Sequence, residues 1–240
     1  MNNNFNFEEE MVYNKKHVNI VNNYDKSKYD FRMYIKECFN VEIDKLDQLH
    51  ELGISLGYNY DVHKEFGPDT QTWYHETFYK YIKSDKGNNI KNMYDNLIKD
   101  VILPYLNLKE ALVQKFPSFR IQLPNNVAVA KCHCDSELGH PYGEINFTYS
   151  ITDMFDTNTI YIEKTTGSKD FIQMPLQANN NISFNANQNL HYNEINITGK
   201  TRMSMDYRIL PINYIPKQET SSHSTNTKFI DGGYYKYVKI

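Results

Sequence analysis

Short strand-forming segments fill the sequence between Ser118 and Pro211, and they constrain the fold more than any other feature. β-Branched and aromatic residues are frequent in them, and several alternate between polar and apolar residues, as half-buried strands do. The eight segments are FRIQL, NVAVAKCHCD, EINFTYSIT, TIYIEKT, FIQMPL, NISFNA, HYNEINI and TRMSMDYRIL. This pattern predicts a double-sheet jelly roll of the cupin type, and a sandwich without a site is the alternative.

The first half of the chain has a helical pattern instead. Apolar residues recur three or four positions apart in several stretches, which is the spacing of one face of a helix. The predicted helical stretches are 26–52, a helix that begins at Asp69 or Thr70, a helix over about 88–103, and a last turn at 108–113. We therefore predict an α+β fold with a mainly β core and an N-terminal helical layer packed on one sheet.

No segment has the composition of a linker, so we predict a single domain with four parts. Residues 1–25 are a polar, partly disordered leader, and residues 26–115 are the helical part. Residues 116–215 are the β core, which carries the chemistry. Residues 216–240 are a tail whose aromatic end, FIDGGYYKYVKI, docks back on the core.

Composition narrows the class of protein. A net charge of −3 argues against a general nucleic-acid binder, which needs a basic face. No apolar stretch approaches the roughly 18–20 residues that cross a membrane, and the N-terminus lacks the pattern of a signal peptide. Cys132 and Cys134 would share a strand face with poor geometry for a disulfide, and the odd number of three cysteines fits a reducing compartment. We therefore expect a cytoplasmic protein.

The tripeptide His133-Cys134-Asp135 is a candidate for part of a metal site. Residues two apart project from the same side of an extended strand, so His133 and Asp135 would face one way. Cys134 would face the other way, and we expect it to be packed rather than catalytic. With His191 as third ligand, the set matches the two histidines and one carboxylate of mononuclear iron oxygenases. A hydrogen-bonded histidine beside a turn-forming aspartate is the alternative interpretation.

A predicted hairpin links the third ligand to an arginine. If the strands pair across the NITG turn, His191 lies opposite Ser204 and faces the same way as Arg202. Alternate residues of TRMSMDYRIL make this face polar and the other apolar. A buried guanidinium needs an anionic partner, so we predict that Arg202, helped by Ser204, binds a carboxylate of an acidic co-substrate.

The resemblance of this chain to a known family is carried by the segments FPSFRIQLP, HCDSELGHPYGEINF, TNTIYIE, GSKDF and LHYNEINITGKTRMSMDYRILP. Over about residues 116–215 the chain resembles the Fe(II)/2-oxoglutarate-dependent oxygenases. Within them it is similar to the phytanoyl-CoA dioxygenase-like group, and in particular to the small StrG-like proteins of streptomycin biosynthesis. The resemblance implies a double-stranded β-helix, which is another name for the jelly roll.

The resemblance also implies a chemistry. Iron would be held by His133, Asp135 and His191, and 2-oxoglutarate would reach it through its ketoacid end. The far carboxylate of 2-oxoglutarate would lie on Arg202 and Ser204. Molecular oxygen would then be consumed, with succinate and carbon dioxide as products and hydroxylation of a substrate as the usual outcome. Asp135 argues against halogenation, because the halogenating relatives replace this carboxylate with a small residue.

Other polar residues of the predicted interior are candidate binding residues. Asn146 and Thr159 are candidates for contacts with 2-oxoglutarate or the substrate. The candidates for a polar or basic substrate are Arg120, Gln122, Glu144, Glu163 and Arg208. Together with Glu137, the acidic candidates favour a small cationic or polyhydroxylated substrate such as an amino acid, an amino sugar or a natural-product intermediate. An ordinary structural role is the open alternative for each of them.

Three other functions compete with this interpretation. Cys132, His133, Cys134 and His140 could hold a structural zinc ion, although consecutive strand residues alternate faces and would not all reach one ion. A cupin-like metal-binding protein, or a pseudo-enzyme that only binds a ligand, would show no oxygen chemistry. An oxygenase of this kind could also act on a protein side chain.

Overall fold

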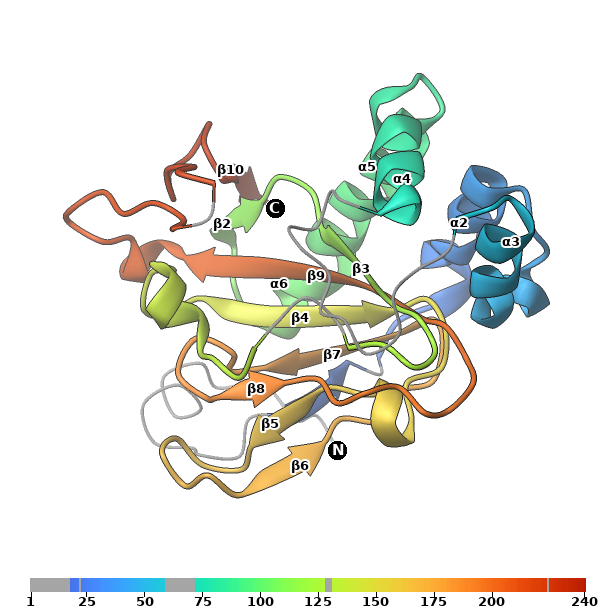
Figure 1. Cartoon of the computed structure of the whole chain (residues 1–240). Helices are drawn as coiled ribbons and strands as arrows, with labels where there is room; N and C mark the ends of the chain where they lie inside the picture. The colour runs from blue at the N-terminus through green and yellow to red at the C-terminus, as the bar shows by residue number, and fades with distance from the viewer. Residues whose placement is uncertain (1–17, 22, 59–71, 128–130, 224) are drawn as a thin grey trace.

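The computed structural model describes residues 18–21, 23–58, 72–127, 131–223 and 225–240. In this part of the chain two antiparallel sheets form the core, and helices lie against the larger one (Figure 1). The predicted α+β class with a mainly β core is therefore confirmed.

The larger sheet has seven strands in the order β1-β7-β4-β9-β2-β10, with β3 also paired to β9. Its strands are β1 (Val18–Val21), β2 (Glu110–Gln114), β3 (Ser118–Gln122), β4 (Ile145–Ser150), β7 (Asn180–Phe184), β9 (Arg202–Pro211) and β10 (Tyr235–Lys239). The ten-residue β9 runs through the middle, with β4 along one edge and β3 and then β2 along the other. Side chains of β9 can therefore meet those of β3 and β4.

The smaller sheet has three strands in the order β6-β5-β8. Its strands are β5 (Tyr161–Glu163), β6 (Phe171–Gln173) and β8 (His191–Tyr192). Ile162 of β5 packs in one apolar cluster with Ile182 and Phe184 of β7. The two sheets therefore face each other across a shared interior.

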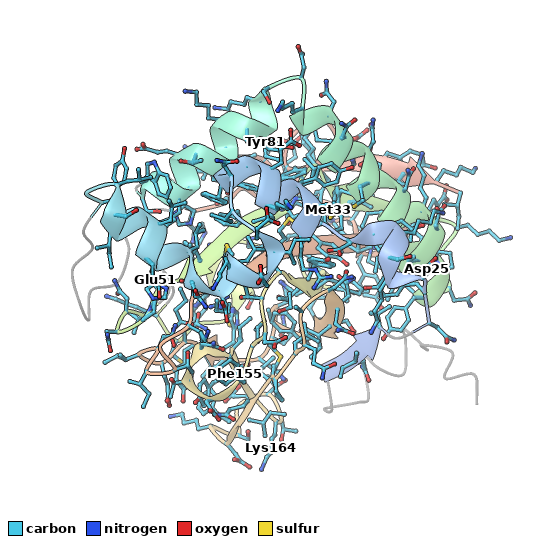
Figure 2. The ribbon with its side chains drawn as sticks, turned by 90° about the vertical axis from the view of Figure 1, so that its right-hand side faces the viewer. Asp25, Met33, Glu51, Tyr81, Phe155 and Lys164 are labelled. Carbon is cyan, nitrogen blue, oxygen red and sulfur yellow. The ribbon has the colours of Figure 1, made fainter. Side chains whose placement is uncertain are left out.

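Helices cover the opposite face of the larger sheet (Figure 1). They are α2 (Arg32–Phe39), α3 (Leu49–Ser55), α4 (Trp73–Lys83), α5 (Gly87–Leu97) and α6 (Leu103–Tyr105), the last two joined by a π-helical turn at Ile98–Ile102. Figure 2 shows this layer, marked by Met33 and Tyr81, with Phe155 and Lys164 at the opposite end of the molecule. None of the described helices combines the length and the apolar character needed to cross a membrane.

The two faces of β9 differ as its alternating sequence predicts. Met203, Met205 and Tyr207 are buried in the core beneath the helices. Arg202, Ser204, Asp206 and Arg208 have the opposite parity and face the shared interior, beside polar side chains of β3 and β4. The strand thus separates a packed apolar core from a polar interior.

The predicted hairpin between β8 and β9 is wrong. β8 pairs with β5 of the smaller sheet, whereas β3 and β4 flank Arg202 and Ser204 of β9. The segment between the two strands instead pairs with residues 125 and 126, through the backbone of Asn196. The NITG segment is therefore a crossover between sheets, and its turn chemistry does not set the register of His191 against β9.

Three helix and leader predictions also need correction. Val18–Val21, placed in the disordered leader, form β1 and pair with β7, while residues 1–17 lie outside the described residues. Residues 108–113 were predicted as a helical turn, but most of them lie in β2 (Glu110–Gln114), because pairing with β9 and β10 overrides local propensity. The helix expected from Asp69 or Thr70, which also lie outside the described residues, is α4 with Thr72 as its N-cap.

Tyr149 joins the helical layer to the larger sheet. Its buried hydroxyl donates to Asn179 Oδ1 at 2.6 Å and accepts from the Phe31 backbone N–H at 3.2 Å. We predict that Tyr149→Phe lowers the free energy of unfolding by about 1–3 kcal/mol, because two buried groups lose their partner. Urea denaturation measures this change. Tyr237→Phe, which removes a hydroxyl bonded to Glu110 at the surface, serves as control, and equal effects of the two variants would contradict the prediction.

Candidate metal centre

Two histidines and one carboxylate converge at one end of the shared interior. His133 Nε2 lies 3.6 Å and His191 Nε2 lies 3.7 Å from Asp135 Oδ1. One ligand atom from each of the three residues lies within 4.8 Å of the others. His191, which is distant in the sequence, therefore joins His133 and Asp135 in a compact set of possible metal ligands.

Backbone hydrogen bonds bring the three residues together. His133 and His191 exchange two of them, with N···O distances of 3.2 and 2.9 Å. The Asp135 N–H donates to the Ala186 carbonyl at 2.8 Å, just before a short 3-10 helix over Asp135–Leu138. The predicted strand over 126–135 is thus reduced, in its described residues, to the single bridge at His133. The extended geometry expected for the whole tripeptide gives way to this turn.

Hydrogen bonds orient both imidazole rings. His133 Nδ1 lies 2.5 Å from the Lys131 carbonyl oxygen, and His191 Nδ1 lies 3.2 Å from the Asn189 carbonyl oxygen. A carbonyl only accepts, so each Nδ1 carries a proton, and in the neutral form of each ring the lone pair is on Nε2. Both lone pairs are therefore available at the side where Asp135 Oδ1 lies, as metal ligation requires.

The set fits a divalent ion. Ligands on one face of a six-coordinate metal, at about 2.1 Å from the ion, stand roughly 3 Å apart. The observed separations of 3.6 and 3.7 Å need only a small contraction to reach this arrangement. Two imidazoles and one carboxylate are the donor types of non-heme iron sites.

Asp135 offers one oxygen to this position and uses the other for hydrogen bonds. Its Oδ2 accepts from Arg208 Nε at 3.0 Å, Arg208 Nη2 at 2.8 Å and Asn146 Nδ2 at 2.8 Å. Asn146 and Arg208 are direct partners in the β4–β9 register, so the sheet delivers both donors to the same oxygen. Oδ1 is left to face the two histidines.

Burial and neighbouring charge set the ionisation of these groups. Burial disfavours the Asp135 carboxylate, but Arg208 and the facing histidines together outweigh it and hold the pKa of Asp135 well below its usual range. Burial lowers the pKa of His191, and Asp135 offsets only part of this effect. For His133 the effect of burial is outweighed by hydrogen bonds to Asp135 and the Lys131 carbonyl, and the pKa is raised. At neutral pH the centre therefore has an ionised carboxylate and a neutral His191.

Arg202 is a buried guanidinium without an acid partner. Its side chain is 1% exposed, Nη1 donates to Ser204 Oγ at 3.0 Å, and Nη2 donates to Gln122 Oε1 at 3.4 Å. Among the described residues, its Nε has no hydrogen-bond partner and no carboxylate forms an ion pair with the guanidinium. Burial lowers the pKa of Arg202 to about 10, although Asp206 partly opposes this. The group is thus a candidate for binding an anion.

A polar group on adjacent strands lies between this arginine and the candidate ligands. Arg120 Nε lies 3.1 Å from Asp206 Oδ2, and Thr148 Oγ1 donates to Asp206 Oδ1 at 2.8 Å. The positive charge of Arg120 acts on both Arg202 and His133, opposing protonation of each. The anion site and the candidate metal ligands therefore belong to one interior.

The remaining predicted residues are engaged elsewhere. The Glu163 carboxylate accepts backbone N–H groups of Gly167, Lys169 and Leu190, so it closes the loop after β5. The Thr159 hydroxyl donates to the Met174 carbonyl at 2.5 Å. These contacts are structural, and they do not bring Glu163 or Thr159 to the candidate metal ligands.

Two sets of residues near the centre bear on the alternatives and the candidate contacts named from the sequence. Neither group of possible metal ligands found among the described residues includes a cysteine, which disfavours the zinc alternative. Asn146 and Arg208, predicted to contact ligands, instead hold Asp135, and Glu144 lies among buried side chains behind it. Tyr234 and Tyr235, which bond Arg208 and Glu144, were not predicted as site residues. The polar parity of β9 placed Arg208 in the interior but did not indicate its contact with Asp135.

Comparison with characterised proteins gives one similar sequence. The streptomycin biosynthesis protein StrG of Streptomyces griseus is 28% identical over 170 residues, covering 71% of this chain and 78% of StrG. This relationship confirms the resemblance indicated by the sequence. No family model matches the chain.

Solved structures share the fold at low sequence identity. The apo form of ThoJ, a non-heme monooxygenase, superposes with a TM-score of 0.53 at 12% identity, covering 96% of this chain and 86% of ThoJ. SnoK, a non-heme alpha-ketoglutarate-dependent carbocyclase from nogalamycin biosynthesis, gives 0.51 at 8% identity, covering 98% of this chain and 97% of SnoK. At these identities the likeness is one of fold.

Proposed function

We propose that this chain is an Fe(II)- and 2-oxoglutarate-dependent oxygenase that acts on a small polar molecule. One observation carries the proposal. The ligand set of His133, Asp135 and His191 shares its interior with Arg202, a buried guanidinium that pairs with no carboxylate of the described residues. A dicarboxylate that chelates a metal at one end needs a cation at the other. This interior provides ligands for the metal and a guanidinium for the far carboxylate.

His133, Asp135 and His191 would hold the iron. The two Nε2 lone pairs and the single free carboxylate oxygen form one face, which leaves the opposite positions open for small molecules. When bound, the iron supplies oxygen activation coupled to oxidative decarboxylation of 2-oxoglutarate to succinate. Asp135 also occupies the position that a halide would need, which favours hydroxylation as the outcome.

Arg202 and Ser204 would bind the far carboxylate of 2-oxoglutarate. Ser204 Oγ already accepts a hydrogen bond from Arg202 Nη1, so its own proton is available to a carboxylate. Gln122 holds Nη2 in place and is itself fixed by donating to the Glu194 carbonyl at 2.6 Å. The guanidinium is thus oriented before the co-substrate arrives, which lowers the cost of binding.

Arg120 and Asp206, supported by Thr148, are the best candidates to meet the substrate. They form a polar group in the interior beside both proposed half-sites. The side chains of Arg120 and Asp206 are 25% and 20% exposed, respectively. A substrate with hydroxyl or amino groups could exchange hydrogen bonds with Arg120 and Asp206, while the fully buried Thr148 holds Asp206 in place. The name of StrG, a streptomycin biosynthesis protein, fits an amino sugar or a related natural-product intermediate.

The proposal includes the architecture and the setting. We propose that the two facing sheets are the two halves of a double-stranded β-helix, with residues 116–215 as the catalytic core and residues 26–115 and 216–240 as its supports. The three cysteines are free, as the predicted cytoplasmic location would keep them. Molecular oxygen and one small substrate would be its partners.

Succinate formation tests this function. We predict that the purified protein with Fe(II), ascorbate and oxygen converts 2-oxoglutarate to succinate, and that a panel of amino acids and amino sugars contains a compound that accelerates it. Removal of the metal with a chelator should abolish the reaction, and restored Fe(II) should recover it. Mass spectrometry of the products identifies the oxidised compound. Absence of succinate with every compound, in protein shown to bind iron, would favour a ligand-binding protein instead.

A further inference from the structure

A buried polar network lies on the Oδ2 side of Asp135. Besides its two hydrogen bonds to Oδ2, Arg208 donates from Nη1 to the Tyr234 hydroxyl at 3.0 Å. Arg208 Nε also lies 3.6 Å from Glu144 Oε2. The Tyr235 hydroxyl donates to Glu144 Oε1. The Tyr234 hydroxyl is therefore two contacts away from the proposed iron ligand, and the Tyr235 hydroxyl is three contacts away.

The network is tightly enclosed. Glu144 is fully buried, and its Oε2 also lies 2.7 Å from His140 Nδ1. The centroid of the His140 ring lies 4.4 Å from that of Phe229 and 5.6 Å from that of Tyr234, which it meets edge-on. Burial raises the pKa of both tyrosines, so their hydroxyls stay protonated near neutral pH. Hydrogen bonds in such an interior are held rigidly, because water cannot replace a lost partner.

Pairing within the larger sheet fixes the position of these hydroxyls. β10, which begins at Tyr235, pairs with β2, and β2 pairs with the end of β9 just beyond Arg208. Asn146 and Arg208 are partners across β4 and β9, and Glu144 precedes β4. One continuous sheet therefore carries every group that acts on Asp135 Oδ2.

We propose that Arg208, Glu144, Tyr234 and Tyr235 are positioning residues for the metal centre, and that the C-terminal segment is part of it. They hold Asp135 so that Oδ2 is saturated by donors and Oδ1 alone is presented to the ion. Asp135 then binds through one oxygen, and the other positions on the ion stay open. This inference rests on the proposed metal site, whereas the identity of the substrate does not affect it.

Two other roles fit these residues less well. Asp135, His140 and Glu144 form a second group of possible metal ligands. However, the Arg208 cation already neutralises two of them, and Tyr235 and His140 use both oxygens of Glu144. A substrate role, which the sequence suggested for Glu144 and Arg208, would require these satisfied groups to give up their partners.

Cobalt binding to the full-length protein tests the network. The protein is freed of metal with a chelator, and Co(II) is added while the visible absorption spectrum reports affinity and coordination geometry. We expect Arg208→Lys, which keeps the charge but loses the fork of donors, to weaken Co(II) binding roughly 10–100-fold and to alter the spectrum. Tyr235→Phe, which removes one oxygen atom, should weaken binding by about tenfold. Tyr234→Phe is a second probe should Tyr235→Phe fail to fold.

Tyr207→Phe is the matched control. Tyr207 is also a buried tyrosine, and its hydroxyl donates to Asn181 Oδ1 at 2.8 Å on the helical side of β9. Both Tyr207→Phe and Tyr235→Phe should lower the melting temperature of the metal-free protein. Only Tyr235→Phe should change the affinity for Co(II), which is measured well below that temperature.

The outcomes separate this inference from the proposed function. The positioning role of the network would be overturned, and the metal site left intact, if three variants kept the wild-type Co(II) affinity and spectrum. These variants are Arg208→Lys, Tyr234→Phe and Tyr235→Phe. Weakened Co(II) binding in these variants would support it, even if the wild type made no succinate. A wild-type protein that bound no Co(II) would overturn both the metal site and the network.

Discussion

Asp135→Asn should lose metal binding although it changes neither the volume nor the shape of the side chain. Arg208 has only donors to offer, so the amide must turn its oxygen toward Arg208 Nε and Nη2. The amide nitrogen then takes the place of Oδ1 and points its hydrogens toward His133 and His191. Because an amide nitrogen has no lone pair for a metal, this substitution replaces a ligand with a blocking group.

The expected size of this effect follows from the buried charges. Loss of one partner from a buried ionic pair costs about 3–5 kcal/mol, so Fe(II) or Co(II) affinity should fall more than roughly 100-fold and succinate formation should be undetectable. Equilibrium dialysis against Co(II) measures the affinity. Asp170→Asn, at a surface pair with Lys164, controls for loss of a negative charge. Metal binding that is unchanged in Asp135→Asn would show that Asp135 is not a ligand.

Arg202→Met should nearly abolish binding of 2-oxoglutarate while leaving the metal in place. The substitution keeps the side chain long and removes its charge, so a bound carboxylate would be left buried without a cation. Removal of one partner of such a pair costs about 2–5 kcal/mol, which weakens binding by roughly 30-fold or more. The metal-free protein should be no less stable than the wild type, because a buried guanidinium without an acid partner is itself costly.

Pyruvate distinguishes an anchor from a general defect in this experiment. It has the ketoacid end of 2-oxoglutarate and lacks the far carboxylate, so Arg202→Met should bind it as the wild type does. Arg32→Met removes an arginine that pairs with Asp30 in the helical layer, and it should leave 2-oxoglutarate affinity unchanged. Calorimetry on the metal-loaded variants measures each affinity. Equal 2-oxoglutarate affinity in Arg202→Met and the wild type would refute the anchor.

The sequence predicted the elements of this fold better than their pairing. The alternation along β9 correctly separated Met203, Met205 and Tyr207 from the polar face, because a period of two is local information. The pairing of β8 depends on β5, a strand that is distant in sequence, and no local turn signal reveals it. Arg202 lies on the predicted polar face of β9, although the hairpin from which this was inferred does not form.

The candidate metal ligands could be predicted from the sequence, whereas the side chains that hold Asp135 in position could not. His133, Asp135 and His191 stand out because the chain has only 8 histidines, and because His133 and Asp135 are two positions apart. Asn146 and Arg208 were visible as polar residues of the interior, but their shared contact with Asp135 Oδ2 depends on the β4–β9 register. Tyr234 and Tyr235 reach the centre only through the pairing of β10 with β2. Such contacts follow from tertiary structure.

The proposed function requires a metal site and an anion site that together hold one molecule of co-substrate. Titration of 2-oxoglutarate by calorimetry into the Mn(II)-loaded and the metal-free protein tests this most directly, since Mn(II) accepts the same ligands as Fe(II). We predict one molecule bound per chain, at least about tenfold more tightly with the metal than without it. Equal affinity with and without Mn(II), or no binding to the loaded protein, would contradict it.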